Sequence, residues 1–168
     1  MISVLGKYNY KFPKPFPLKF KLKDLLEENV DEKYYLSDKQ INVSPTLTTR
    51  SGAYAAGMIL VKNNTKQGYL EATIGDGIDI SSRMEHHRGN VQKDKIQTLT
   101  TAGGNERGVV ENDLRIRKLT PREAFRLMGV KDEDYDNVAK NQSDASLYHL
   151  AGDSIVVNVL MAIFKELL

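Results

Sequence analysis

Apolar positions in the last third of the chain follow a helical spacing. They recur every three or four residues, which predicts an amphipathic helix starting at Ser154. The apolar positions of this stripe are Ile155, Val156, Val159, Leu160, Ile163, Phe164, Leu167 and Leu168. Upstream, Thr120 followed by Pro121 and Glu123 has the form of an N-cap, a first-turn proline and a capping box, so a helix is expected from there to Gly129. Shorter polar helices are expected over 131–140 and 143–150.

The middle of the chain has a different pattern. Between Ile41 and Val110, short β-prone runs alternate with glycine-bearing turns. The sequence Thr-Leu-Thr-Thr occurs twice, at 46–49 and 98–101, and each copy leads into a loop that contains glycine. We therefore expect an irregular lobe of paired strand-loop elements that presents two loops.

The first 40 residues combine an apolar start with a basic connector. Met1 to Leu5 is a predicted strand, and residues 7–23 hold six lysines, three prolines and no acidic residue, which favours an extended path. A short helix is expected over 24–30, and residues 33–36, with the Tyr34-Tyr35 pair, are expected to lead into a turn at Ser37-Asp38. The predicted organisation is α+β, with a strand and connector over 1–40, a lobe over 41–116 and a helical segment over 117–168.

Composition limits the class of protein. The 168 residues are 40% hydrophobic and carry a net charge of +2, which suits one compact domain or two small lobes. No apolar run approaches the roughly 20 residues of a membrane span, and the start of the chain lacks the features of a secretory signal. We expect a cytoplasmic protein with no membrane association.

The charge is distributed unevenly. Residues 1–126 carry 21 basic against 15 acidic residues, whereas residues 127–168 carry 3 against 7. A basic body of this kind suits a polyanion such as nucleic acid, although a merely solvated surface would have the same composition. Several arginines sit in glycine-bearing loops beside small polar residues, a combination that suits phosphate contacts and guanine edges. The candidate DNA-binding residues are Thr49, Arg50, Ser51, Arg83, Arg88, Asn105 and Arg107.

The side chains available for catalysis are few. The chain has no cysteine, which excludes disulfides, thiolate zinc sites and a cysteine nucleophile within these residues. His86 and His87 are adjacent, so they would point to opposite faces of a strand, and His149 stands alone. The 103–108 loop lacks the lysine of a phosphate-binding loop. We expect no metal site and no catalytic residue.

Two segments near the C-terminus carry a specific resemblance. Residues 117–129, Arg-Lys-Leu-Thr-Pro-Arg-Glu-Ala-Phe-Arg-Leu-Met-Gly, resemble the ninth conserved motif of DNA cytosine-5 methyltransferases, and residues 150–159, Leu-Ala-Gly-Asp-Ser-Ile-Val-Val-Asn-Val, resemble the tenth. The Thr-Leu-Thr-Thr segments and residues 31–37 resemble parts of the family's target-recognition region. The resemblance covers nearly the whole chain but only the last third of a complete enzyme.

The resemblance implies a set of partners and roles. It implies double-stranded DNA as substrate and S-adenosylmethionine as methyl donor, within cytosine methylation and restriction–modification. Asp153 and Ser154 occupy the position where the family has Asn-Ser beside the methionine end of the cofactor, and a helix N-terminus there would favour its carboxylate. The final helix would pack on an α/β catalytic domain that is absent here, so its apolar stripe is expected to be exposed or covered by a second copy.

The resemblance also identifies what these residues lack. The family attacks cytosine with the thiolate of a Pro-Cys motif and is assisted by a glutamate in a Glu-Asn-Val motif. The triplet Glu28-Asn29-Val30 precedes the recognition region, so it is not expected to be catalytic. We expect the DNA-recognition and C-terminal portion of a methyltransferase, inactive alone and dependent on a catalytic half.

Other interpretations remain open at this stage. A stand-alone DNA-binding or regulatory protein, or a structural module without nucleic-acid affinity, would also fit the sequence. The chain could be an excised fragment, a subunit of a split enzyme or a gene remnant.

Overall fold

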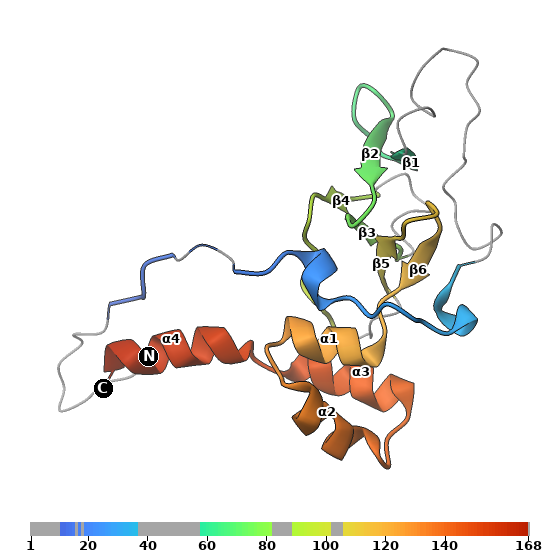
Figure 1. Ribbon diagram of the computed structural model, residues 1–168. Helices are drawn as coiled ribbons and strands as arrows, with labels where there is room; N and C mark the ends of the chain where they lie inside the picture. Colours follow the sequence, from blue (N-terminus) through green and yellow to red (C-terminus); the bar gives the residue numbers. More distant parts are fainter. Residues whose placement is uncertain are drawn as a thin grey trace.

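The computed structural model describes residues 11–15, 17, 19–36, 58–81, 89–101 and 106–167. Within these residues the fold is α+β, as predicted: a lobe of short strands stands above a group of helices, and the last helix projects to one side (Figure 1). The predicted strand at Met1–Leu5 lies outside the described residues.

The β lobe contains two small antiparallel sheets. A hairpin of two strands stands beside a four-stranded sheet with the order β4-β3-β5-β6. The strands are β1 (Met58–Lys62), β2 (Tyr69–Thr73), β3 (Gly77–Asp79), β4 (Val91–Gln92), β5 (Arg107–Val110) and β6 (Ile116–Lys118). The hairpin and the sheet bury one shared apolar cluster of Val61, Ala72, Ile78, Val110 and Ile116. The strand-and-loop prediction is therefore confirmed for the part of the lobe that the structure describes.

Three helices form a second core below the lobe: α1 (Pro121–Leu127), α2 (Asp132–Ala139) and α3 (Asp144–Asp153). The predicted capping box is present, because Thr120 accepts from the Glu123 N–H at 3.2 Å while the Glu123 carboxylate accepts from the Thr120 N–H at 2.7 Å. Gly129 follows with a positive φ of 80°, a conformation that ends the helix and favours glycine. Apolar residues of α1 and α3 pack together in the second core: Ala124, Phe125, Met128, Leu147, Tyr148 and Ala151.

The basic connector joins the two cores through short 3₁₀ turns, η1 (Leu22–Leu25) and η2 (Glu32–Tyr34). Leu22 is buried with Val109 and Leu119 in a third apolar cluster. The predicted helix over 24–30 is wrong. The Glu27 N–H donates to the Glu123 carboxylate at 2.8 Å, so it is not available to continue a helix.

Glu123 also forms a fully buried pair with Arg117, whose guanidinium donates two hydrogen bonds to the carboxylate at 2.7 and 2.8 Å. Since the same carboxylate caps α1 and holds the connector, this pair links the last strand, the first helix and the segment before the lobe. Removal of Arg117 would leave the buried Glu123 carboxylate without its ion-pair partner, whereas Arg117 would still pair with Glu111 if Glu123 were removed.

The last helix, α4 (Val157–Leu167), begins later than predicted. The Ser154 N–H donates to the Leu150 carbonyl and the Ser154 hydroxyl donates to the Ala151 carbonyl, so Ser154 closes α3 and does not open α4. The Val157 N–H then bonds the Met128 carbonyl at 2.9 Å, which fixes the start of α4 beside the end of α1.

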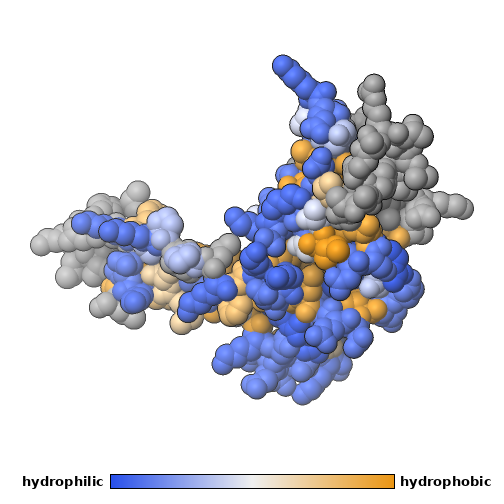
Figure 2. Space-filling model, turned by 45° about the horizontal axis from the view of Figure 1, so that its top comes forward, coloured by the Kyte–Doolittle hydropathy of each residue, from blue (hydrophilic) through white to orange (hydrophobic). Residues whose placement is uncertain are grey.

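Part of the predicted apolar stripe is exposed. The exposed fractions are 49% for Val159 and 54% for Phe164, and 60% for Ile155 just before α4, whereas Val156, Leu160 and Ile163 are half-buried; Met161 beside the stripe is 64% exposed. Figure 2 shows apolar surface along the arm that this helix forms. Counted together, α3 and α4 give a 24-residue stretch long and apolar enough to cross a membrane, but α3 buries Leu147 and Ala151 in the helical core.

Candidate nucleic-acid interface

The candidate DNA-binding residues fall mostly outside the part of the chain that the structure describes. Only Arg107 lies within it; the others are Thr49, Arg50, Ser51, Arg83, Arg88 and Asn105. The structure does show where two of the three candidate segments, 82–88 and 102–105, leave and re-enter the lobe.

These two segments attach at neighbouring positions of the four-stranded sheet. Segment 82–88 follows Ser81, just past the end of β3, and segment 102–105 ends at Glu106, just before β5. In the antiparallel register Asp79 faces Arg107, and the Ile80 N–H donates to the Glu106 carbonyl at 3.0 Å. The sheet therefore brings together two chain segments that are about 20 residues apart in sequence.

Arg107 lies at the centre of this shared base. Its side chain is 9% exposed, and its Nε and Nη2 atoms donate to the Thr98 carbonyl at 3.1 and 2.9 Å. Its Nη1 atom donates to the Glu106 carbonyl at 3.1 Å and lies 3.5 Å from the Asp79 carboxylate. The guanidinium thus binds the irregular segment that contains Thr98 to both β3 and β5. Its predicted contact with DNA stays a prediction, whereas this internal role is visible.

The last turn of α3 supports the same base from below. A Cβ atom at Gly152 would overlap the Thr100 carbonyl and lie 2.8 Å from the Thr101 nitrogen. Leu99 packs against the helical core from the same segment. Only glycine allows this close approach of the helix to residues 100–101. Residues 98–101 are therefore held by Arg107 on one side and by α3 on the other.

Gly89, which follows segment 82–88, is held by hydrogen bonds to the β1–β2 hairpin. The Gly89 N–H donates to the Lys62 carbonyl at 3.2 Å, and the Asn63 amide donates to the Gly89 carbonyl. A Cβ atom at Gly89 would collide with Val61 and Lys62. The sequence signal for this anchor was the Arg-Gly pair at 88–89, but which strand it would contact depends on the tertiary fold.

Asp76 organises the other end of β3. Its buried carboxylate accepts from the Thr73 N–H at 2.7 Å, the Thr73 hydroxyl at 2.8 Å, the Lys93 ammonium at 2.7 Å and the Asp94 N–H at 3.1 Å. Burial alone would raise the pKa of this carboxyl, but the hydrogen bonds from Lys93, Thr73 and Asp94 outweigh it and hold the pKa below its usual range. Asp76 was not among the residues selected from the sequence.

The two candidate cofactor residues lie together at an exposed helix end. The Asp153 carboxylate is 3.0 Å from His149 Nδ1 and its side chain is 55% exposed, while the Ser154 hydroxyl donates to the Ala151 carbonyl at 2.9 Å. They follow the C-terminal end of α3, so the predicted helix N-terminus at Ser154 is wrong. An exposed carboxylate suits the ammonium of a methionine moiety. The two side chains fit one edge of a cofactor site and could not hold the cofactor alone.

A groove of about 870 Å³ lies between the connector, the end of α1 and the start of α4. Its lining combines apolar side chains with basic ones and includes neither Asp153 nor Ser154. The apolar part is formed by Phe20, Leu25, Ile96, Val159 and Met161, several of which are exposed. The groove therefore continues the open stripe of α4.

Comparison with known proteins supplies a family. The sequence matches C-5 cytosine-specific DNA methylases over residues 4–168. The type II methyltransferase M2.ScrFI of Lactococcus lactis subsp. cremoris is 31% identical over 170 residues, covering 99% of this chain and 39% of that protein. The orphan methyltransferases M.SPRI of Bacillus phage SPR and M.SPBetaI of Bacillus phage SPbeta are 28% and 27% identical, with 98% of this chain covered in each case. The chain spans 53% of the former and 46% of the latter, about half their length.

Proposed function

Because the chain belongs to the C-5 cytosine-specific DNA methylase family, we propose that it forms the target-recognition and C-terminal portion of a DNA cytosine-5 methyltransferase. The family acts on DNA and takes its methyl group from S-adenosylmethionine. The observation that carries the proposal is the shared base around Arg107, because it joins the ends of an arginine-bearing segment, 82–88, and of the Gly-Gly-Asn segment 102–105 at adjacent strands of one sheet.

The proposed reading surface consists of the segments attached to this base. Arg83 and Arg88 in one segment, and Asn105 in the other, would meet the duplex together, and the Thr49-Arg50-Ser51 segment would contribute from the side of β1. The buried guanidinium of Arg107 would hold the two attachment points in register and would not itself read bases. The duplex would be engaged next to the cytosine that the enzyme extrudes.

The chemistry would come from a catalytic half. The family's nucleophile is a cysteine thiolate and these 168 residues contain no cysteine, so this chain is proposed to be inactive by itself. S-adenosylmethionine, when bound in the assembled enzyme, supplies the methyl group that is transferred to cytosine. Asp153 and Ser154 would bind one edge of its methionine moiety. The proposed place of action is the cytoplasm.

The open stripe of α4 is proposed to receive that catalytic half. Burial of the half-exposed side chains of Val159, Met161 and Phe164 would supply a hydrophobic contact, at about 25 cal/mol per Å² of apolar surface removed from water. A second copy of this chain could cover the same stripe, and self-association is the competing occupant.

A methyl-transfer assay tests the proposal. The chain is incubated with labelled S-adenosylmethionine and mixed-sequence duplex DNA, first alone and then with a separately expressed catalytic half that contains the Pro-Cys motif. We expect no transfer from the chain alone and transfer from the mixture. Transfer by the chain alone would refute the role assigned to the missing cysteine. If the mixture shows no methyl transfer but the chain still binds DNA, a stand-alone DNA-binding or regulatory protein would be favoured.

A further inference from the structure

Two lysine-bearing segments that are far apart in sequence lie together beside the β lobe. Residues 19–23 carry three lysines and residues 93–95 carry two, and we refer to Lys19, Lys21, Lys23, Lys93 and Lys95 as the lysine patch. The segments are joined by an ion pair between Lys21 Nζ and the Asp94 carboxylate at 2.9 Å, and by a hydrogen bond from the Leu22 N–H to the Asp94 carbonyl at 2.9 Å.

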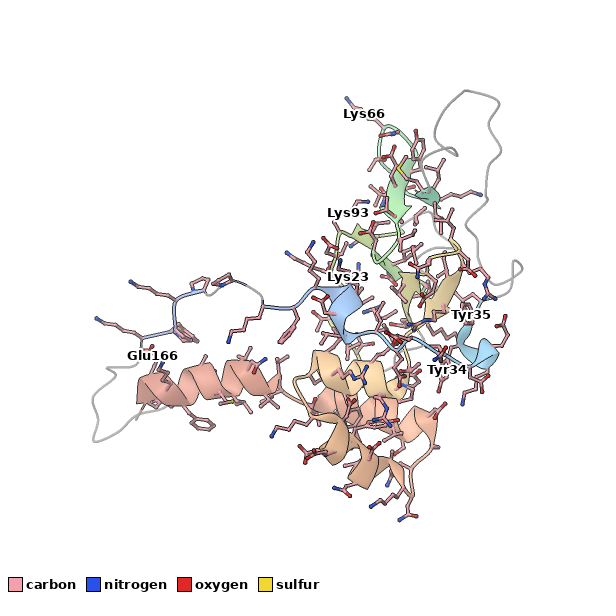
Figure 3. All side chains as sticks on the ribbon, viewed as in Figure 1. Lys23, Tyr34, Tyr35, Lys66, Lys93 and Glu166 are labelled. Atoms are coloured by element: carbon pink, nitrogen blue, oxygen red, sulfur yellow. The ribbon has the colours of Figure 1, made fainter. Side chains whose placement is uncertain are left out.

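The connection extends through the turn at the end of β2. Lys93 donates to Asp76 at 2.7 Å, and the Cβ atom of Lys23 lies 3.8 Å from where a Cβ would stand on Gly75. Figure 3 shows Lys23 and Lys93 along the same edge of the lobe, with Lys66 farther along that edge at the hairpin turn. The patch is therefore one surface and not a set of scattered charges.

Acidic residues cancel only part of the positive charge of this surface. Asp94 is paired with Lys21 and Asp76 with Lys93, and Asp24 lies beside Lys21, so three carboxylates face the five lysines. Lys19, Lys23 and Lys95 are exposed, and none has an acidic partner in the described part of the chain. The patch thus presents several ammonium groups that are free to meet a polyanion.

The distance between the lysine patch and the base of segments 82–88 and 102–105 suits a nucleic-acid backbone. Asp76 holds the patch at one end of β3, and Asp79 belongs to the base of segments 82–88 and 102–105 at the other end. Three residues of strand span about 10 Å. Phosphates of one DNA strand are spaced by about 3.4 Å along the helix axis, so a duplex read by the loops would carry several phosphates within that span.

We propose that the lysine patch binds the phosphate backbone of the duplex beside the bases that the loops read. The inference rests on the proposed function, since it takes DNA as the partner. Lysine is a compact point charge without the planar fork of arginine, so the patch contributes affinity and salt dependence with little preference for sequence.

Fluorescence anisotropy with a labelled mixed-sequence duplex tests the proposal. The full chain is titrated over a range of salt concentrations and compared with the double variant Lys23→Gln/Lys95→Gln, which removes two lysines that have no ion-pair partner in the structure described. The matched control is Lys140→Gln/Lys165→Gln, which removes the same charge from the ends of α2 and α4. Thermal unfolding of each variant verifies that the fold is retained.

We expect the patch variant to lower the slope of log affinity against log salt by about 0.9 for each lysine that contacts a phosphate, and to weaken binding several-fold or more at about 0.1 M salt. The control should change both quantities much less. This result would support the proposal.

Other outcomes would overturn it in distinguishable ways. If the unaltered chain binds DNA and the patch variant matches the control, the lysine patch does not contact phosphate but the proposed function stands. If the unaltered chain shows no salt-sensitive binding to duplex DNA, both the role of the lysine patch and the proposed function are refuted. If the patch variant binds DNA normally but no longer combines with a catalytic half, the patch faces a protein.

Discussion

Replacement of Arg107 by methionine distinguishes a residue that holds the reading loops from one that touches DNA. The guanidinium donates two hydrogen bonds to the Thr98 carbonyl and faces the Asp79 carboxylate, which is 3% exposed. Methionine keeps much of the aliphatic volume but provides no donor. The Thr98 carbonyl and the Asp79 carboxylate would therefore lose a partner while remaining in the protein.

The expected cost follows from these contacts. Removal of one member of a buried ion pair costs about 3–5 kcal/mol. The Arg107–Asp79 distance of 3.5 Å is long, and Asp79 also accepts from the Ser81 N–H at 3.0 Å, so the lower end applies. We expect a loss of about 3 kcal/mol in the free energy of unfolding. For a chain of this length that corresponds to a fall of roughly 6–12 °C in Tm.

Urea unfolding followed by circular dichroism measures the loss, and the double variant Arg107→Met/Asp79→Asn provides the control. Since the second change removes the orphaned charge, the double variant should lose clearly less than the two single variants summed. If the role of Arg107 is the internal one, the salt slope of DNA binding should not change, because no phosphate contact is removed. A variant with unchanged stability and a reduced salt slope would show that Arg107 contacts DNA and would refute this reasoning.

Three further predictions concern other parts of the molecule. Gly152→Ala should cost about 2 kcal/mol in unfolding free energy, because its Cβ would overlap the Thr100 carbonyl, and should weaken DNA binding; equal Tm and affinity would contradict the close approach. Asp76 has a depressed pKa in the folded state, so the stability it contributes is present above about pH 4 and is lost as the pH falls through its folded value. Below pH ~4 the free energy of unfolding should therefore fall less steeply with pH for Asp76→Asn than for the unaltered chain. Parallel curves for the two proteins would contradict the role assigned to Asp76. Phe164→Ser should reduce methyl transfer by the chain mixed with a catalytic half and leave DNA binding unchanged. Normal transfer would show that Phe164 of α4 is not part of the docking surface.

Local signals in the sequence were sufficient where the stabilising contacts are local. The capping box between Thr120 and Glu123 spans three residues, so the start of α1 could be predicted from sequence. The start of α4 could not. A serine before an apolar stripe resembles an N-cap, but Ser154 bonds back to α3, and the helix begins where the Val157 N–H meets the Met128 carbonyl.

The candidate site shows the same limit. An arginine in a glycine-bearing loop suits DNA, but whether its side chain turns inward depends on the register that places it opposite Asp79, 28 residues earlier. The lysine patch likewise depends on the pair between Lys21 and Asp94, 73 residues apart. Neither the Arg107–Asp79 contact nor the Lys21–Asp94 contact can be predicted from the spacing of residues along the chain.

The shared base around Arg107 has an evolutionary consequence. Segments 82–88 and 102–105 leave and return at points fixed by buried bonds, so a replacement of either segment would inherit the same exits from the sheet. The entropy of closing a longer insert rises only by about 0.6 kcal/mol per doubling of its length. New reading loops could therefore be exchanged like cassettes with little selection against the change in stability, while the helices below remain untouched. If these segments read the target as proposed, such an arrangement would let target preference change while the scaffold stays the same.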